Sequence, residues 1–163
     1  MDSMKLRGQF RLEVWRQGKI VESEVLNNLI TYEGFDHLLD STFDAATQVA
    51  NWYIGFIDNS GFSAVAIGDT HDSHAGWTET TPYSDATRVE WGPDAAVNGV
   101  ITNSTSADFT INATAAINGI FISNISTKGS TASGVLFNAA SLAAVKNVVS
   151  GDTVKVTYQL TAS

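Results

Sequence analysis

Two histidines and two aspartates lie within six positions, in the segment Asp69-Thr70-His71-Asp72-Ser73-His74. Imidazole nitrogens and carboxylate oxygens bind zinc or calcium when they converge at about 2.0–2.6 Å. The spacing matches no established metal motif, and the segment has no periodicity that would place both imidazoles on one face. We therefore expect local hydrogen bonds in a loop, with no metal and no cofactor, and the roles of His71 and His74 stay open.

Patterns for covalent and acid–base catalysis are missing from the sequence. A serine hydrolase needs its nucleophile on a strained turn such as Gly-x-Ser-x-Gly, which is absent. The chain has no cysteine, which excludes thiolate catalysis and disulfides. Glu79 and Glu90 lie near aromatic residues, as a glycosidase pair would, but acids at a surface rim are the expected interpretation. The sequence predicts that the protein is not an enzyme.

Aromatic residues offer another kind of site, because tryptophan rings stack on sugar rings. The candidates for such a face are Trp15, Trp52, Trp77, Trp91, Tyr53 and Tyr83. The alternative places Trp52 and Trp91 in the core, because they lie in strand-like segments, and lets Trp77 pack its loop against the fold. A carbohydrate-binding module therefore stays open as a lesser alternative.

The charge of the chain is acidic and unevenly distributed. Its 163 residues carry 17 Asp+Glu and 9 Lys+Arg, a formal net charge of −8, which argues against binding to nucleic acid. Five of the nine basic residues fall within positions 1–19: Lys5, Arg7, Arg11, Arg16 and Lys19. They pair either with an acidic neighbouring molecule or, within the fold, with Glu13, Glu22 and Glu24.

The elements that position these residues are mostly strands. Alternation of Phe10, Leu12 and Val14 with polar residues predicts a half-buried strand, and a turn at 16–19 makes residues 5–27 a hairpin. Thr31 is a suitable N-cap for one short helix near residues 32–44. The apolar run 52–57 predicts a buried central strand, in which Gly55 indicates close approach of a neighbouring side chain, such as a tryptophan.

The remainder of the chain predicts an all-β fold, a single β-sandwich or jelly-roll-like domain over residues 1–163. Further strand-like segments cover 88–91, 98–102, 108–112, 116–123, 134–137 and 153–160. Residues 58–86 lack periodicity and predict a long loop that a partner chain orders. No apolar run suggests a membrane span, and no signal peptide is expected. The expected core comprises Phe10, Leu12, Val14, Leu38, Leu39, Trp52, Ile54, Phe56, Ile111, Phe121, Val154, Val156 and Tyr158.

Several phrases of the sequence resemble a family of small structural proteins from the virions of tailed bacteriophages. They are Asn28-Leu29-Ile30-Thr31-Tyr32-Glu33-Gly34, the run from Trp52 to Phe62, Ser73-His74-Ala75-Gly76-Trp77-Thr78-Glu79, Phe109-Thr110-Ile111-Asn112-Ala113-Thr114, Gly119-Ile120-Phe121 and Ser126-Thr127-Lys128-Gly129. These phrases span nearly the full length of the chain. The extra histidine in 69–74 is a departure that suggests a specialised loop.

The resemblance implies a capsid decoration, or cement, protein on the surface of the virion. Its partners would be the major capsid protein and further copies of itself, as a homo-oligomer such as a dimer or trimer, without nucleic acid or membrane. A tail or head-fibre component that contacts the host is the alternative. The residues expected to face the capsid or a sister subunit are Lys5, Arg7, Arg11, Arg16 and Trp77.

Overall fold

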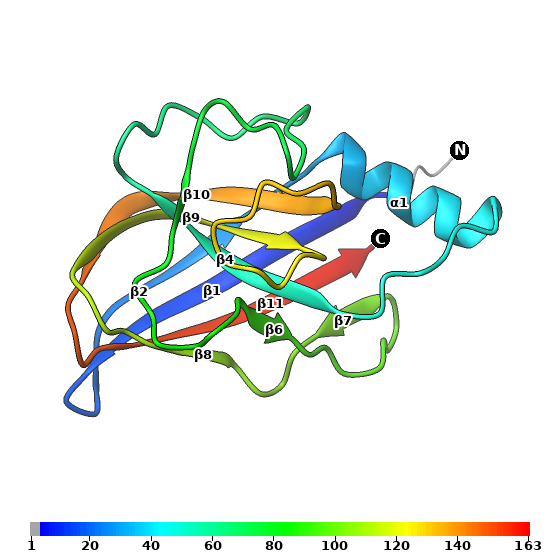
Figure 1. The fold of residues 1–163 in the computed structure, drawn as a ribbon. Helices are drawn as coiled ribbons and strands as arrows, with labels where there is room; N and C mark the ends of the chain where they lie inside the picture. Colours follow the sequence, from blue (N-terminus) through cyan, green and yellow to red (C-terminus); the bar gives the residue numbers. More distant parts are fainter. Residues whose placement is uncertain (1–3) are drawn as a thin grey trace.

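The alternating segments of the sequence form two antiparallel sheets that pack face to face, as Figure 1 shows for the computed structural model of the chain. The structure describes residues 4–163, so the part of the predicted N-terminal segment at residues 1–3 lies outside the described residues. The predicted all-β sandwich is confirmed. The elements are β1 (Leu6–Arg16), β2 (Lys19–Asn27), β3 (Leu29–Ile30), α1 (Tyr32–Phe43), β4 (Trp52–Asp58), β5 (Glu79–Thr80), β6 (Val89–Trp91), β7 (Val100–Thr102), β8 (Ala107–Thr110), β9 (Ala115–Ser123), β10 (Leu136–Val148) and β11 (Thr153–Ala162).

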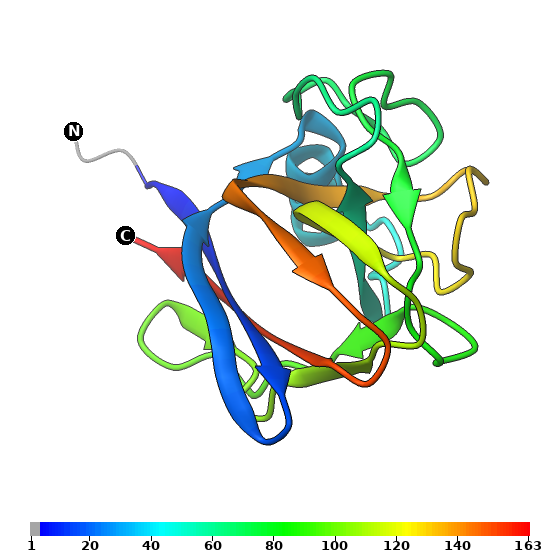
Figure 2. The same cartoon turned by 90° about the vertical axis from the view of Figure 1, so that its left-hand side faces the viewer.

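The first sheet has the order β2-β1-β11-β7, with β8 also paired to β11. Its inner face follows directly from the alternation in β1, because Phe10, Leu12 and Val14 are fully buried. They lie opposite the equally buried Tyr158, Val156 and Val154 of β11. The first and last strands are therefore neighbours, and Figure 2 shows the start of β1 and the end of β11 on the same side of the molecule.

The second sheet has the order β3-β10-β9-β4-β5, with β6 also paired to β4. Its central strands, β4, β9 and the first half of β10, are buried on both faces, in agreement with the unbroken apolar run in β4. Phe56 and Ile120 face the first sheet, whereas Ile57 and Phe121 face a second cluster that Trp77, Phe62 and Val65 of the long loop cover. The long loop therefore forms a third layer over the outer face of this sheet.

The predicted helix is confirmed as α1, and the Thr31 hydroxyl caps it by accepting a hydrogen bond from the Gly34 amide. A Cβ at Gly34 would overlap the Phe137 carbonyl oxygen, so glycine lets the helix lie directly on β10. This approach turns the packed face towards Gly34, Phe35 and Leu38. The prediction of a buried Leu39 is wrong: its side chain is 56% exposed, because it is turned about 100° from Leu38 and about 140° from Gly34 around the helix axis.

Other differences from the sequence predictions concern lengths and partners. The predicted strand at 134–137 is the start of β10, which continues to Val148, and the two-residue strands β3 and β5 were not predicted. Close approach at Gly55 is confirmed, but its neighbour is the ring of Phe121 and not a tryptophan. Trp52 is half-buried against the core that the sequence placed it in. Within residues 4–163 no helix is long and apolar enough to cross a membrane.

Candidate functional site

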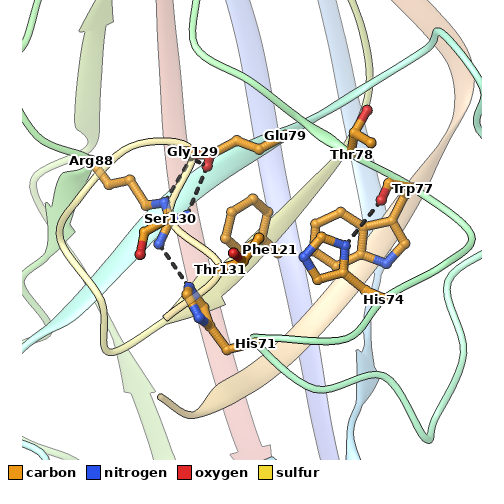
Figure 3. A pocket seen from close by; sticks show the side chains of 10 residues that line it. All are labelled: His71, His74, Trp77, Thr78, Glu79, Arg88, Phe121, Gly129, Ser130 and Thr131. Carbon is orange, nitrogen blue, oxygen red and sulfur yellow. Dashed lines mark hydrogen bonds and ion pairs between the residues drawn. The ribbon is translucent and has the colours of Figure 1, made fainter. Parts of the chain in front are cut away.

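The polar residues of the long loop meet a buried ion pair beneath it, shown in Figure 3. Arg88, immediately before β6, is 2% exposed and Glu79 of β5 is 7% exposed. Arg88 Nε and Nη2 donate to the two Glu79 carboxylate oxygens at 2.8 and 2.7 Å. The amide of Gly129 also donates to Glu79, at 2.6 Å. Glu79 is thus a buried structural carboxylate, which corrects its interpretation as an acid at a surface rim.

His71 takes a fixed tautomer from its two neighbours. Its Nδ1 lies 2.6 Å from the carbonyl oxygen of Ala132, which only accepts, so Nδ1 carries the proton. Its Nε2 is then free to accept from Arg88 Nη1 at 3.1 Å. Burial lowers the pKa of His71, and the positive charge of Arg88 lowers it further against the opposing Ala132 bond. The imidazole is therefore neutral with both nitrogens engaged, and it has no lone pair left for a metal ion.

The loop is fixed to the sheet by Trp77, whose indole is 3% exposed and packs 5.1 Å from the ring of Phe121. Its Nε1 donates to Asp69 at 2.9 Å, and His74 stacks on its other face at 3.7 Å. The sequence prediction placed Trp77 at an interface, whereas in this structure residues of the same chain cover its side chain. Phe62 and Val65 of the same loop also pack against this cluster, and ordering of the loop by a partner chain stays a prediction.

A cavity of about 220 Å³ lies between these two groups, with Phe121 at its base and Ser130 and Thr131 at its rim (Figure 3). The His74 Nδ1 is 3.0 Å from the carbonyl oxygen of Trp77. The buried charges of Arg88 and Glu79 neutralise each other. Among the described residues, no group of three or more His, Cys, Asp or Glu side chains is arranged to hold a metal ion.

The tryptophans do not form an exposed aromatic surface. Trp77 and Trp91 are buried, and Trp91 donates its indole hydrogen to Asn103 at 3.1 Å. Trp15 and Trp52 are half-buried. Stacking of a sugar ring needs an accessible ring face. The arrangement therefore gives no support to the alternative of a carbohydrate-binding module.

The basic residues of the N-terminal segment divide into two groups. Arg16 makes a two-point ion pair with Asp152, at 2.7 and 2.8 Å, and its hydrogen bonds hold the pKa of that carboxyl below the ordinary value. Arg11 pairs with Glu13 on its own strand at 2.8 Å. Both arginines are thus paired within the fold, although Glu22 and Glu24, offered by the sequence as partners, pair with Lys146 instead.

The second group consists of Lys5, Arg7 and Lys19, which are exposed. None of the three makes an ion pair with an acidic residue in the part of the chain that the structure describes. Lys5 and Arg7 lie at the end of the sandwich where the C-terminus also ends, since the Lys5 amide donates to the Ser163 carbonyl at 2.6 Å. Beside them runs a groove of about 410 Å³, lined by Arg7, Gly8, Gln9, Asn27, Gln159, Thr161 and Ser163.

Sequence reasoning missed Arg88 and Lys146, the two most deeply buried cations of the described chain. Arg88 has no local signal, because its partners come from β5, from residue 71 and from the loop after β9. Lys146 lies in a stretch of β10 whose small side chains hide the strand pattern. The length of the 58–86 loop is the one available indication that something beneath it must be covered.

Neither protein-family models nor curated protein sequences yield a match to this chain.

Proposed function

We propose that the protein is a structural component of a tailed-phage virion that decorates the outer surface of the capsid. The observation that carries this proposal is the pair of unpartnered cations, Lys5 and Arg7, beside a polar groove on an otherwise acidic chain. An acidic patch on the major capsid protein is the complementary partner. The resemblance of the sequence phrases to virion proteins supports the same role.

The hydrogen bonds within the candidate site also favour a structural role over catalysis. The polar side-chain atoms of this site form hydrogen bonds with one another and with the backbone, in the group Arg88, Glu79 and His71. Such a protein acts by binding the assembled shell and not free subunits, so it stabilises the assembled state by mass action. Many copies on one shell then convert modest contacts into high avidity.

The copy number in the particle tests the role directly. We expect quantitative mass spectrometry of purified virions to find hundreds of copies of this chain per particle, because a decoration protein repeats with the capsid lattice. A few copies would instead place the protein in the tail or a fibre. Its absence from the particle would contradict any structural role.

Docking through the cations is tested by replacing Lys5 and Arg7 together with serine. Exposed ion pairs contribute about 0–1 kcal/mol each, so we expect the protein concentration for half-occupancy of empty capsids to rise about tenfold. The matched control is Gln48→Glu with Asn98→Asp, which makes the same change in net charge at exposed positions elsewhere. Equal binding by both double variants at low salt would contradict docking at this end of the sandwich.

A further inference from the structure

Exposed apolar side chains are concentrated on two elements. Residues 4–163 contain ten exposed large hydrophobic residues, of which three lie on β2 and three on α1. On α1 these are Tyr32, Leu39 and Phe43, at 59%, 56% and 82% exposure. Their spacing of seven and four residues places them within about 20° of one line along the helix. They form a stripe that the chain's own core leaves uncovered.

The stripe on α1 is flanked by negative charge. Asp36, Asp40 and the C-cap Asp44 are exposed and make no ion pair with any described residue. The helix contains no lysine or arginine. We call Tyr32, Asp36, Leu39, Asp40 and Phe43 the helix patch. A partner for this surface must be apolar and positively charged.

The start of β2 has the opposite charge. Lys19 is exposed without an ion pair in the described chain, and Ile20 and Val21 beside it are each 46% exposed. We call these three residues the hairpin tip. The exposed cations without an ion pair in the described chain, Lys5, Arg7 and Lys19, all lie on the first hairpin or directly before it, so the other surfaces of a second copy would bring mostly acidic groups.

The two surfaces cannot meet within one chain. Figure 1 shows the turn between β1 and β2 at one end of the sandwich and α1 at the other, and Figure 2 shows the same separation in height. We propose that the hairpin tip of one copy binds the helix patch of a second copy. Lys19 would lie between the helix aspartates, with Ile20 and Val21 against Leu39 and Phe43.

This contact is heterologous, since it joins two different surfaces of the same chain. Repetition of such a contact closes into a ring or extends as an open chain. It rests on the proposed decoration function in so far as a homo-oligomer is what the resemblance to virion proteins implies, but it requires no capsid. Self-association is therefore measured on the free protein, and its failure is distinct from a failure to bind shells.

Sedimentation velocity of complementary variants tests the proposal. One variant carries Leu39→Ser and Phe43→Ser, and the other carries Ile20→Ser and Val21→Ser. We expect each alone to need at least a tenfold higher concentration to associate than the parent protein. Mixed at equal concentration, the two should recover association and stop at a 1:1 dimer, because one intact tip meets one intact patch.

Charge reversal gives a second, independent measurement. Lys19→Glu should weaken association of the parent protein about tenfold, and Asp40→Lys in the same chain should restore it. Val97→Ser is the control, because it removes a side chain that is 65% exposed outside both surfaces. A parent protein that stays monomeric up to millimolar concentration overturns the proposal. So does a mixture that stays monomeric, or a tip variant that associates as well as the parent.

Discussion

Replacing Arg88 with methionine is expected to lower the free energy of unfolding by about 3–5 kcal/mol, because it leaves the buried carboxylate of Glu79 without its counter-charge. For a chain of this length the loss corresponds to a fall in the melting temperature of about 6–20 °C. Glu79→Gln should cost a similar amount, since it leaves the guanidinium uncompensated beneath the loop. Chemical and thermal denaturation of the purified variants measure both effects.

Two comparisons separate the role of the pair from a general effect of mutation. The double variant Arg88→Met with Glu79→Gln should lose much less than the sum of the single losses, because neither charge is then left alone. Lys155→Met removes one partner of the exposed pair with Asp108, 33% and 45% exposed, and should cost no more than about 1 kcal/mol. Additive losses, or equal losses at the two pairs, would contradict the argument.

The parts of the fold that the sequence predicts are those with local causes. The Thr31 cap and the alternation of Phe10, Leu12 and Val14 act over a few residues, so α1 and the first hairpin are predicted nearly to their ends. Burial of the helix face is different. It depends on how Gly34 meets Phe137, a contact between residues far apart in the chain, and the sequence pattern alone placed Leu39 inside.

The second half of β10 shows why a strand escapes prediction. Its pairing with β9 shifts between Ser141 and Lys146, where the four β10 residues 142–145 lie opposite the single β9 residue Asn118. This irregularity interrupts the two-residue alternation on which strand prediction relies. The extra residues include Ala143, whose amide donates to the side-chain carboxylate of Glu24 on β2.

The buried pair at the candidate site was unpredictable for a related reason. Arg88 and Glu79 are nine residues apart, but an irregular loop joins them and no periodicity relates their side chains. The aromatic residues had a local signal, and the interpretation that placed Trp77 and Trp91 inside is the one that the structure supports. For Arg11 and Arg16, pairing within the fold was one of the two alternatives that the sequence left open. Of the partners named there, only Glu13 forms such a pair, and Arg16 pairs with Asp152 instead.

Strands β2 and β10 belong to different sheets, and side-chain contacts join them. Glu24 makes these contacts and is therefore a second residue whose replacement should have a large effect on stability. One carboxylate oxygen accepts from the Ala143 amide at 2.6 Å and the other from Lys146 at 2.7 Å. Lys146 is only 6% exposed. A glutamine at position 24 has a single oxygen for these two donors. We therefore expect Glu24→Gln to lower the free energy of unfolding by about 3 kcal/mol.

The same contacts predict how the loss depends on pH. Burial disfavours the charged form of Glu24, but the bonds from Lys146 and Ala143 outweigh it and hold its pKa below the ordinary value. A carboxyl with a lowered folded-state pKa stabilises fully above its unfolded pKa, about 4.3, and progressively less as the pH falls through the folded value. The difference between the parent and Glu24→Gln should thus be constant near neutral pH and shrink in acid.

Glu22→Gln is the matched control, because the same substitution two residues earlier changes a carboxylate that is 38% exposed and 3.8 Å from Lys146. It should alter stability by no more than about 1 kcal/mol and leave the acid response of the parent nearly intact. Urea unfolding at a series of pH values between 3 and 7 measures both variants under the same conditions. If the stability lost in Glu24→Gln is unchanged at pH 3, or is no larger than that lost in Glu22→Gln, the Glu24 carboxylate does not hold β2 to β10.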